Sequence, residues 1–389
     1  MTPSLPMRLA DLHQDEALRQ REFPVTRDRI YLAHAGVCPL PRRVAEAVRQ
    51  GAESSMGNDQ ETALPEGFLI ETRARAARLL GARPEEIALV GPTSLGLSTV
   101  AAGLDFRRGD NVLIYFDDYP SNVYPWLALG ERAVEVRFVQ VRELGSIRAA
   151  DVLGQVDEQT RLVALASCHF ISGYRIDLES IGRALRERGI LFCLDAIQTL
   201  GAFPTPVDHV DFLAADSHKW LLGPCAAGLL YVRGAVQDRL RPWARGWHNV
   251  RCPGFVAQEE MVLRPDARRY EAGSHNLLGL AGLGAALGLL EEIGVDSIAR
   301  DLLHKRRRMV ATLLDSGCEV LNPAPPPRHA GGIVSFRPRR PPAEVYARLS
   351  AAGVSASLRT DRAGGQWIRF SPHYYNTEAE LDHALGLVD

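Results

Sequence analysis

The chain has 389 residues, of which 46% are hydrophobic and 24% are charged, and its formal net charge is −2 at pH 7. This length allows two or three structural units with a large core. Because the charges nearly balance, we expect no nucleic acid and no membrane as a partner, and a small molecule is the default substrate. No apolar signal core opens the sequence, and no stretch approaches the roughly 20 apolar residues of a membrane helix. We therefore expect a cytoplasmic protein.

The cysteine and lysine content indicates which kinds of reactive group the chain can use. Six cysteines are scattered without a CxxC pair or a Cys/His cluster at metal-ligand spacing, which predicts reduced thiols and no metal site. Only two of the 45 basic residues are lysines, Lys219 and Lys305. A lysine retained where arginine is otherwise used is a candidate for forming an imine through a neutral amine, which a guanidinium cannot do. Chance retention is the alternative.

Helix and strand patterns alternate from about residue 66. Residues 66–81 have a helical pattern of apolar residues. Runs of strand character then recur at regular intervals, several with amphipathic segments between them, at 87–90, 111–115, 134–139, 161–166, 190–194, 210–214 and 228–232. This alternation is typical of an α/β fold with a mainly parallel, buried, seven-stranded sheet.

The C-terminal third has a different organisation. A helical stretch at about 276–316 is followed by a proline-rich break at 321–332. Strand-like 333–336, helix-like 343–352 and a final strand and helix complete the chain. We predict a smaller α+β domain made of 1–28 and 290–389, beside a large domain at 29–289.

A possible phosphate cradle lies in VGPTSLGLSTVAAGL, where a predicted strand ends at Val90 and a helix begins near Ser94. Backbone amides at such a helix start, with the hydroxyls of Thr93 and Ser94, can bind phosphate. Threonine and serine are also common helix caps without any ligand, and this reading is the more common one.

Two further segments place reactive side chains after strands. LFCLDAIQTLGA delivers Asp195 at the carboxyl end of a strand, where open α/β sheets bind ligands and where a carboxylate can keep a pyridinium nitrogen protonated. A helix cap or an ion pair is its alternative role. FLAADSHKWLLGPCAAGLLYV places Ser217, His218 and Lys219 before apolar Trp220. Desolvation there would lower the pKa of the Lys219 amine.

Taken in order, these segments resemble a known family. The motifs DAIQTLGAFP, DSHKWLLGP and EAGSHN, between YLAHAGVCPLP and SPHYYNTEAELD, are similar to those of the class V aminotransferase superfamily of fold-type I pyridoxal phosphate enzymes. Cysteine desulfurases, selenocysteine lyase, kynureninase and isopenicillin N epimerase belong to this superfamily. The resemblance spans nearly the whole chain and implies pyridoxal 5'-phosphate as the cofactor.

The resemblance also implies roles for the residues around the cofactor ring. Lys219 would carry the cofactor as a Schiff base, and Asp195 would bind the pyridine nitrogen. Gln198 would donate a hydrogen bond to the phenolic oxygen. Tyr119, in DDYPSNVYPW, would stack on the ring, a role that suits an aromatic side chain.

On the phosphate side, the resemblance implies Thr93, Ser94 and His218 as ligands, with Ser217 as a further cofactor-binding residue. Ser274, in EAGSHN, corresponds to a residue that in relatives reaches the phosphate bound by the other subunit. A homodimer with two shared active sites follows from that correspondence.

Two arginines are candidates for binding an amino acid substrate. Arg369, in WIRFSPHYYNT, matches the family arginine that holds the substrate α-carboxylate with its planar fork. Arg359, in ASLRTD, is a second candidate. A solvated surface arginine is the alternative for both.

The chain departs from cysteine desulfurases at two places. The segment RTDRAGGQW has no cysteine where desulfurases carry the one that attacks substrate sulfur, and a persulfide mechanism needs such a thiolate. Phe170 stands where many desulfurases have an asparagine near the substrate. Cys38 and Cys225 lie in motif segments, but they are more simply read as small buried residues.

These observations predict a pyridoxal phosphate enzyme acting on an amino acid, most simply an aminotransferase. The alternative is a C–S lyase or an epimerase on the same cofactor, but not a persulfide-forming cysteine desulfurase. A binding module without catalysis would be expected to have lost Lys219 or Asp195, and both are present.

Overall fold

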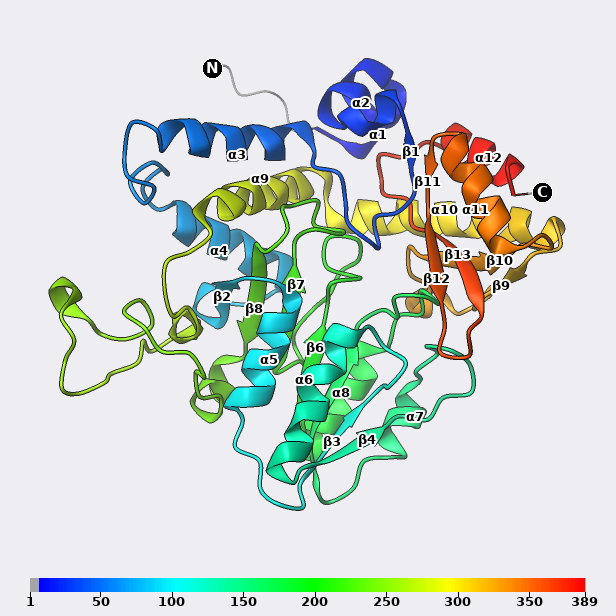
Figure 1. The fold of residues 1–389 in the computed structure, drawn as a ribbon. Helices are drawn as coiled ribbons and strands as arrows, with labels where there is room; N and C mark the ends of the chain where they lie inside the picture. The colour runs from blue at the N-terminus through cyan, green and yellow to red at the C-terminus, as the bar shows by residue number, and fades with distance from the viewer. Residues whose placement is uncertain (1–6, 389) are drawn as a thin grey trace.

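The computed structural model describes residues 7–388 (Figure 1). Its main sheet has seven strands in the order β2-β8-β7-β6-β5-β3-β4. Only β8 runs antiparallel to its neighbours. The strands are β2 (Ile87–Val90), β3 (Asn111–Ile114), β4 (Glu135–Phe138), β5 (Thr160–Ala166), β6 (Leu191–Asp195), β7 (Phe212–Asp216) and β8 (Gly228–Val232). The predicted mainly parallel seven-stranded sheet is confirmed.

Helices cover both faces of this sheet because alternate strand residues point to opposite sides. Leu113, Val163 and Phe192 pack in one buried cluster with residues of α4 (Phe68–Leu80), α8 (Leu178–Glu187) and α9 (Leu277–Ile293). Their neighbours in the strands, such as Val112 and Ala164, pack in a second cluster with α5 (Thr93–Gly103) and α6 (Tyr124–Leu127). The sheet is therefore the middle layer of a three-layer core.

The predicted helical stretch at 276–316 consists of two helices that meet at a bend. Gly294 has φ 82° and ψ 120°, a conformation that glycine adopts easily, and it separates α9 from α10 (Val295–Asp315). No single helix in 7–388 is long and apolar enough to cross a membrane; α9 and α10 together pass by length and composition only, bent by 76°.

The C-terminal part forms the predicted small α+β unit. Its four-stranded antiparallel sheet has the order β12-β13-β10-β9 and shares a core with α10, α11 and α12. The bounds are β9 (Glu319–Val320), β10 (Val334–Arg337), α11 (Pro342–Ala351), β12 (Ser357–Thr360), β13 (Gln366–Phe370) and α12 (Glu378–Gly386).

The N-terminal segment joins this C-terminal part. Strand β1 (Ile30–Tyr31) pairs in parallel with β11 (Val354–Ser355). Helices α1 (Leu9–Gln14) and α2 (Glu16–Glu22) precede it, and Arg19 of α2 is ion-paired to Glu380 of α12 at 2.7 Å. The domain limits at 29 and 290 stay a prediction.

Two further helices pack beside helices of the large layer, and one long segment is irregular. Helix α3 (Arg42–Ser54) lies along α9, and the short α7 (Ala149–Leu153) lies beside α8. The segment 243–265 extends away from the rest of the protein with little regular structure (Figure 1).

Candidate active site

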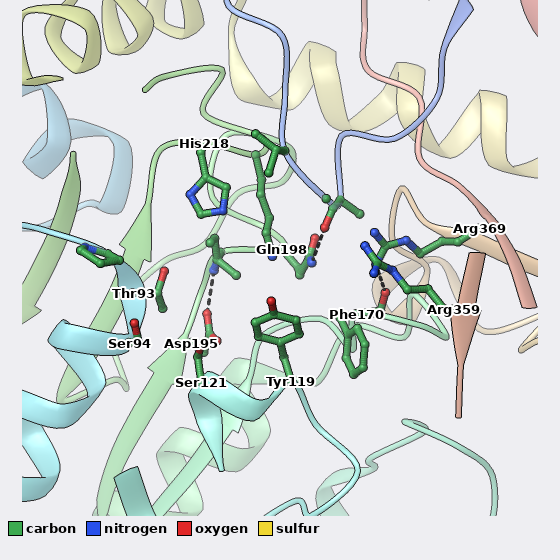
Figure 2. A pocket seen from close by; sticks show the side chains of 16 residues that line it. Thr93, Ser94, Tyr119, Ser121, Phe170, Asp195, Gln198, His218, Arg359 and Arg369 are labelled. Carbon is green, nitrogen blue, oxygen red and sulfur yellow. Dashed lines mark hydrogen bonds between the residues drawn. The ribbon is translucent and has the colours of Figure 1, made fainter. Parts of the chain in front are cut away.

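A cavity of about 280 Å³ lies where strand ends of the main sheet meet the small unit (Figure 2). Strands β2, β3, β5, β6 and β7 run in the same direction, so the segments after their carboxyl ends gather at one edge. Nine of the predicted site residues line the cavity: Thr93, Ser94, Tyr119, Asp195, Gln198, His218, Lys219, Arg359 and Arg369.

Lys219 is buried in the wall of this cavity and is 5% exposed. Burial lowers the pKa of its amine to about 8, although Asp195 opposes the shift. Among the described residues, Nζ has no hydrogen-bond or ion-pair partner, and it lies 5.1 Å from the centroid of the Tyr119 ring. An unpaired amine with a lowered pKa is suited to imine formation.

Asp195 ends strand β6 and is buried, with one carboxylate oxygen accepting the Ile197 N–H at 3.0 Å. Its other oxygen has no partner within residues 7–388. Burial raises the pKa of Asp195, while the Ile197 N–H and the Lys219 amine act in the opposite direction. A buried carboxylate with a free oxygen facing a cavity is the group needed to bind a pyridinium N–H.

The Gln198 amide is held in one orientation (Figure 2). Trp220 donates its indole N–H to Gln198 Oε1 at 2.9 Å, and Gln198 Nε2 donates to the Ala35 carbonyl at 3.1 Å. An indole nitrogen can only donate and a carbonyl can only accept, so the two contacts fix which end of the amide is which. One N–H of Gln198 remains for a ligand.

The phosphate side is built at the first residues of α5. Thr93 begins this helix, and its hydroxyl accepts the Asp216 N–H at 2.9 Å. The same Asp216 accepts from His218 Nδ1 at 2.7 Å, leaving His218 Nε2 available to the cavity. Free amides at the start of an eleven-residue helix, flanked by Thr93 and Ser94, are suited to a phosphate.

Two predicted cofactor residues lie outside the cavity. Ser217 is fully buried, and its hydroxyl donates to the Pro224 carbonyl at 2.6 Å, so the structure does not bring it into the site. Ser274 lines a separate cavity of about 660 Å³ beside Phe68 and Trp247. Its predicted role at a partner's phosphate stays a prediction.

Tyr119 and Phe170 form an aromatic wall of the cavity (Figure 2). Their ring centroids are 5.4 Å apart and the rings meet edge to face. The position of Tyr119 beside Lys219 suits the predicted stacking on a cofactor ring. The Phe170 ring has no hydrogen-bonding group, and the Phe170 carbonyl already accepts from Arg369 Nη1.

Arg359 and Arg369 line the cavity opposite its phosphate side. Arg369 is 1% exposed and donates from Nη1 to the Phe170 carbonyl at 2.6 Å. Burial and the neighbouring Arg359 lower the pKa of Arg369 to about 9. No carboxylate of the described residues pairs with either guanidinium.

Sequence reasoning missed several residues of the site. Ala35, Gly36 and Val37 line the cavity after β1, and Ser121 lines it near Tyr119. Residues 35–37 belong to the motif YLAHAGVCPLP. The similarity of this motif to the family was the only feature of the sequence that could have placed these residues at the site. The donor role of Trp220 had no signal in the sequence, because it depends on a contact with Gln198.

One cluster outside the site has metal-ligand geometry. Atoms of His248, Glu271 and His275 lie within 4.8 Å of one another. Both Glu271 oxygens are already engaged, by Arg73, the Leu89 N–H and His275. The cluster is explained by hydrogen bonds and the Arg73 ion pair.

Taken together, the cavity fits pyridoxal phosphate. An unpaired amine, a carboxylate with a free oxygen and a helix start with two hydroxyls face it from different elements. These are the groups that an aldehyde carbon, a pyridine nitrogen and a phosphate require.

Comparison with known proteins agrees with this chemistry. The chain is 31% identical over 383 residues to a probable cysteine desulfurase of Methanothermobacter thermautotrophicus, covering 93% of this chain and 94% of the relative. It is 29% identical to the uncharacterized aminotransferase YcbU of Bacillus subtilis, covering 96% and 97%. A cysteine desulfurase from Thermococcus onnurineus, solved in its apo form, matches with a TM-score of 0.86 and 25% identity, covering 95% and 96%.

The family model for class V aminotransferases matches residues 30–383, nearly the whole chain. The chain belongs to the class V aminotransferase family and is a pyridoxal phosphate-dependent enzyme.

Proposed function

We propose that this enzyme is an aminotransferase acting on an amino acid, with Lys219 as the residue that holds the cofactor and moves the substrate α-proton. The observation that carries the proposal is the Lys219 amine, which is buried, has a pKa lowered to about 8 and has no partner in residues 7–388. Such an amine is reactive near neutral pH.

The residues around Lys219 have complementary tasks. Bound pyridoxal phosphate supplies an electron sink for the charge that develops at the substrate Cα. Asp195 would hold the pyridine nitrogen in its protonated form through its free oxygen, and Arg369 would orient the substrate through its α-carboxylate. Lys219 Nζ would take the proton from the substrate Cα.

Absorbance spectroscopy tests transamination. Purified enzyme is titrated with a panel of amino acids, with and without a keto acid. The visible cofactor absorbance should bleach with the amino acid and return when the keto acid is added. Lys219→Ala should retain cofactor but lose turnover, and an unaltered rate in this variant would contradict the role of Lys219.

A C–S lyase is the second candidate, and the relatives favour it. Several relatives are named as cysteine desulfurases or probable cysteine desulfurases, yet no cysteine of residues 7–388 lines the cavity. The turn at 361–365, between β12 and β13, also has none. Cys38 comes closest in sequence to a lining residue, and burial raises the pKa of its thiol to about 12. Cleavage of a C–S bond would then proceed without a protein persulfide.

Product analysis separates the two reactions. A lyase releases pyruvate and sulfide or a persulfide from a sulfur amino acid without any keto acid. An aminotransferase consumes keto acid and amino acid in equal amounts. An epimerase would instead invert the amino acid and release nothing.

We also propose a homodimer in which Ser274 serves the partner's cofactor site. Ser274 lies away from the cavity of its own chain, beside the extended segment 243–265. That segment exposes large apolar side chains, which are Trp243, Trp247, Phe255, Val256, Met261 and Val262. Apolar groups gathered on one segment are typical of a protein interface.

A further inference from the structure

Arg359 and Arg369 come from neighbouring strands and face the same way. In the antiparallel pair β12 and β13, Arg369 is opposite Ser357 and Arg359 is opposite Trp367. Residues two apart in a strand share a face, so the two arginines are diagonal neighbours on the face that borders the cavity. Figure 2 shows their guanidinium groups next to each other.

No carboxylate within residues 7–388 pairs with either of these arginines. In that part of the chain Arg369 donates only to the Phe170 carbonyl and, at 3.4 Å, to the Ser357 hydroxyl, and its Nε is buried without a partner. Arg359 Nε is also buried without a partner. Of the other buried arginines in residues 7–388, Arg73 and Arg19 are paired with carboxylates, whereas Arg306 donates to the carbonyls of Ile333 and Asn322 and does not border the cavity.

Gly36 lies beside both guanidinium groups. A Cβ on Gly36 would lie 3.7 Å from Arg359 Nη2 and 3.8 Å from Arg369 Nη2. Glycine therefore leaves clear the volume that both Nη2 atoms border. Two like charges at such close range repel each other, and a bound anion removes the repulsion.

The donors of the pair exceed what one carboxylate needs. Each guanidinium has five N–H groups and can bind one carboxylate with two parallel hydrogen bonds. When a substrate α-carboxylate is bound to Arg369, the positive charge of Arg359 still has no anionic partner.

We propose that Arg359 binds a second acid group, so that the substrate is an α-amino acid with an acidic side chain. This inference rests on the proposed function, because it assumes that the α-carboxylate of an amino acid binds Arg369. The inference adds the chemical class of the substrate side chain, which is acidic.

Binding to the holoenzyme tests the proposal without turnover. The ligands are α-methylaspartate and 2-aminoisobutyrate, which lack an α-proton and differ in the second carboxylate. Dissociation constants come from the change in cofactor absorbance. Succinate and propionate, which lack an amino group, form a second pair whose binding is measured by competition with α-methylaspartate and by thermal shift.

The wild type should bind the diacid of each pair at least tenfold more tightly than the monoacid. Arg359→Met should remove that preference by weakening diacid binding far more than monoacid binding, and Arg359→Lys should restore part of it. Arg308→Met is the control, because Arg308 pairs with Asp382 on the surface, away from the cavity.

Equal weakening of monoacid and diacid in Arg359→Met would overturn the proposal, because both arginines would then hold one carboxylate. Absence of a diacid preference in the wild type would overturn it as well. If succinate binds through Arg359 while no amino acid alters the cofactor spectrum, the second acid site stands and the proposed reaction on amino acids fails.

Discussion

At the scale of single residues, Trp220 and the Ala35 carbonyl together hold the Gln198 amide in one orientation. Without the indole N–H only the Ala35 carbonyl holds the amide, and an amide that turns places an oxygen against the phenolic oxygen of the ring, which repels it. Trp220→Phe keeps most of the buried ring and should cost roughly 1 kcal/mol of stability. It should also shift the absorbance maximum of bound cofactor and lower kcat more than it changes KM.

Trp126→Phe is the matched control for this prediction. Trp126 is as buried as Trp220 and donates to Asn122 Oδ1 at 3.0 Å, but it does not line the cavity. Identical cofactor spectra in Trp220→Phe and the wild type would show that Gln198 needs no positioning.

In the cofactor-free enzyme, the buried Lys219 amine should destabilise the folded state. Its folded-state pKa of about 8 lies below the ordinary value of 10.5, so between these pH values the unfolded chain binds more protons than the folded one. The cost is therefore full below pH 8 and fades as the pH rises towards 10.5.

Lys219→Met should make the cofactor-free protein more stable at pH 7, by up to roughly 3 kcal/mol. Denaturant unfolding of both proteins at pH 7 and at pH 10 measures the difference. The gain should be smaller at pH 10. A gain that does not depend on pH would mean that the amine is not buried in its charged form.

At the scale of elements, helix α5 holds the phosphate side in place through a close contact at Gly96. A Cβ on Gly96 would lie 2.8 Å from the Ala214 Cβ of strand β7. Gly96→Ala should push the helix start outward, cost about 1–3 kcal/mol through overpacking and weaken cofactor binding.

The control for the helix contact is Gly130→Ala, where the added methyl group meets no atom within 4 Å. Cofactor affinity is measured by fluorescence titration and stability by thermal unfolding. Equal cofactor affinity in Gly96→Ala and the wild type would show that phosphate binding does not depend on the position of α5.

The elements also show what a sequence can predict. All seven strands of the main sheet were predicted to within two residues at each end, because six are short apolar runs and β4 alternates charged with apolar residues. The pairing of β1 with β11 was not predicted, since two-residue strands have no periodicity and their partners are over 300 positions apart. The irregular 243–265 segment has no pattern either.

The same reasoning applies to the site. Residues at strand ends, such as Asp195 and Lys219, were predictable because parallel strands end at one edge. Ser217 has the same local signal, yet its hydroxyl turns to Pro224, because direction depends on the turn that follows. Contacts between distant segments, such as Trp220 with Gln198 or Gly36 with the two arginines, need coordinates.

At the scale of the whole molecule, we predict a homodimer with a mass near twice the 42.7 kDa of the chain. Phe255→Asp with Met261→Asp should shift it towards monomer, because charges would then replace exposed apolar groups. Analytical ultracentrifugation measures the change. A wild type that sediments as a monomer would contradict the dimer and the role of Ser274.

The proposed chemistry depends on covalent attachment of the cofactor at Lys219. The chain has only one other lysine, Lys305, whose amine is ion-paired to Asp301 at 2.5 Å. Reduction of the holoenzyme with borohydride, followed by peptide mass spectrometry, reads the attachment point directly. We predict a pyridoxyl group on Lys219 alone. A label on Lys305, or no label on Lys219 in protein that retains the cofactor, would contradict the account.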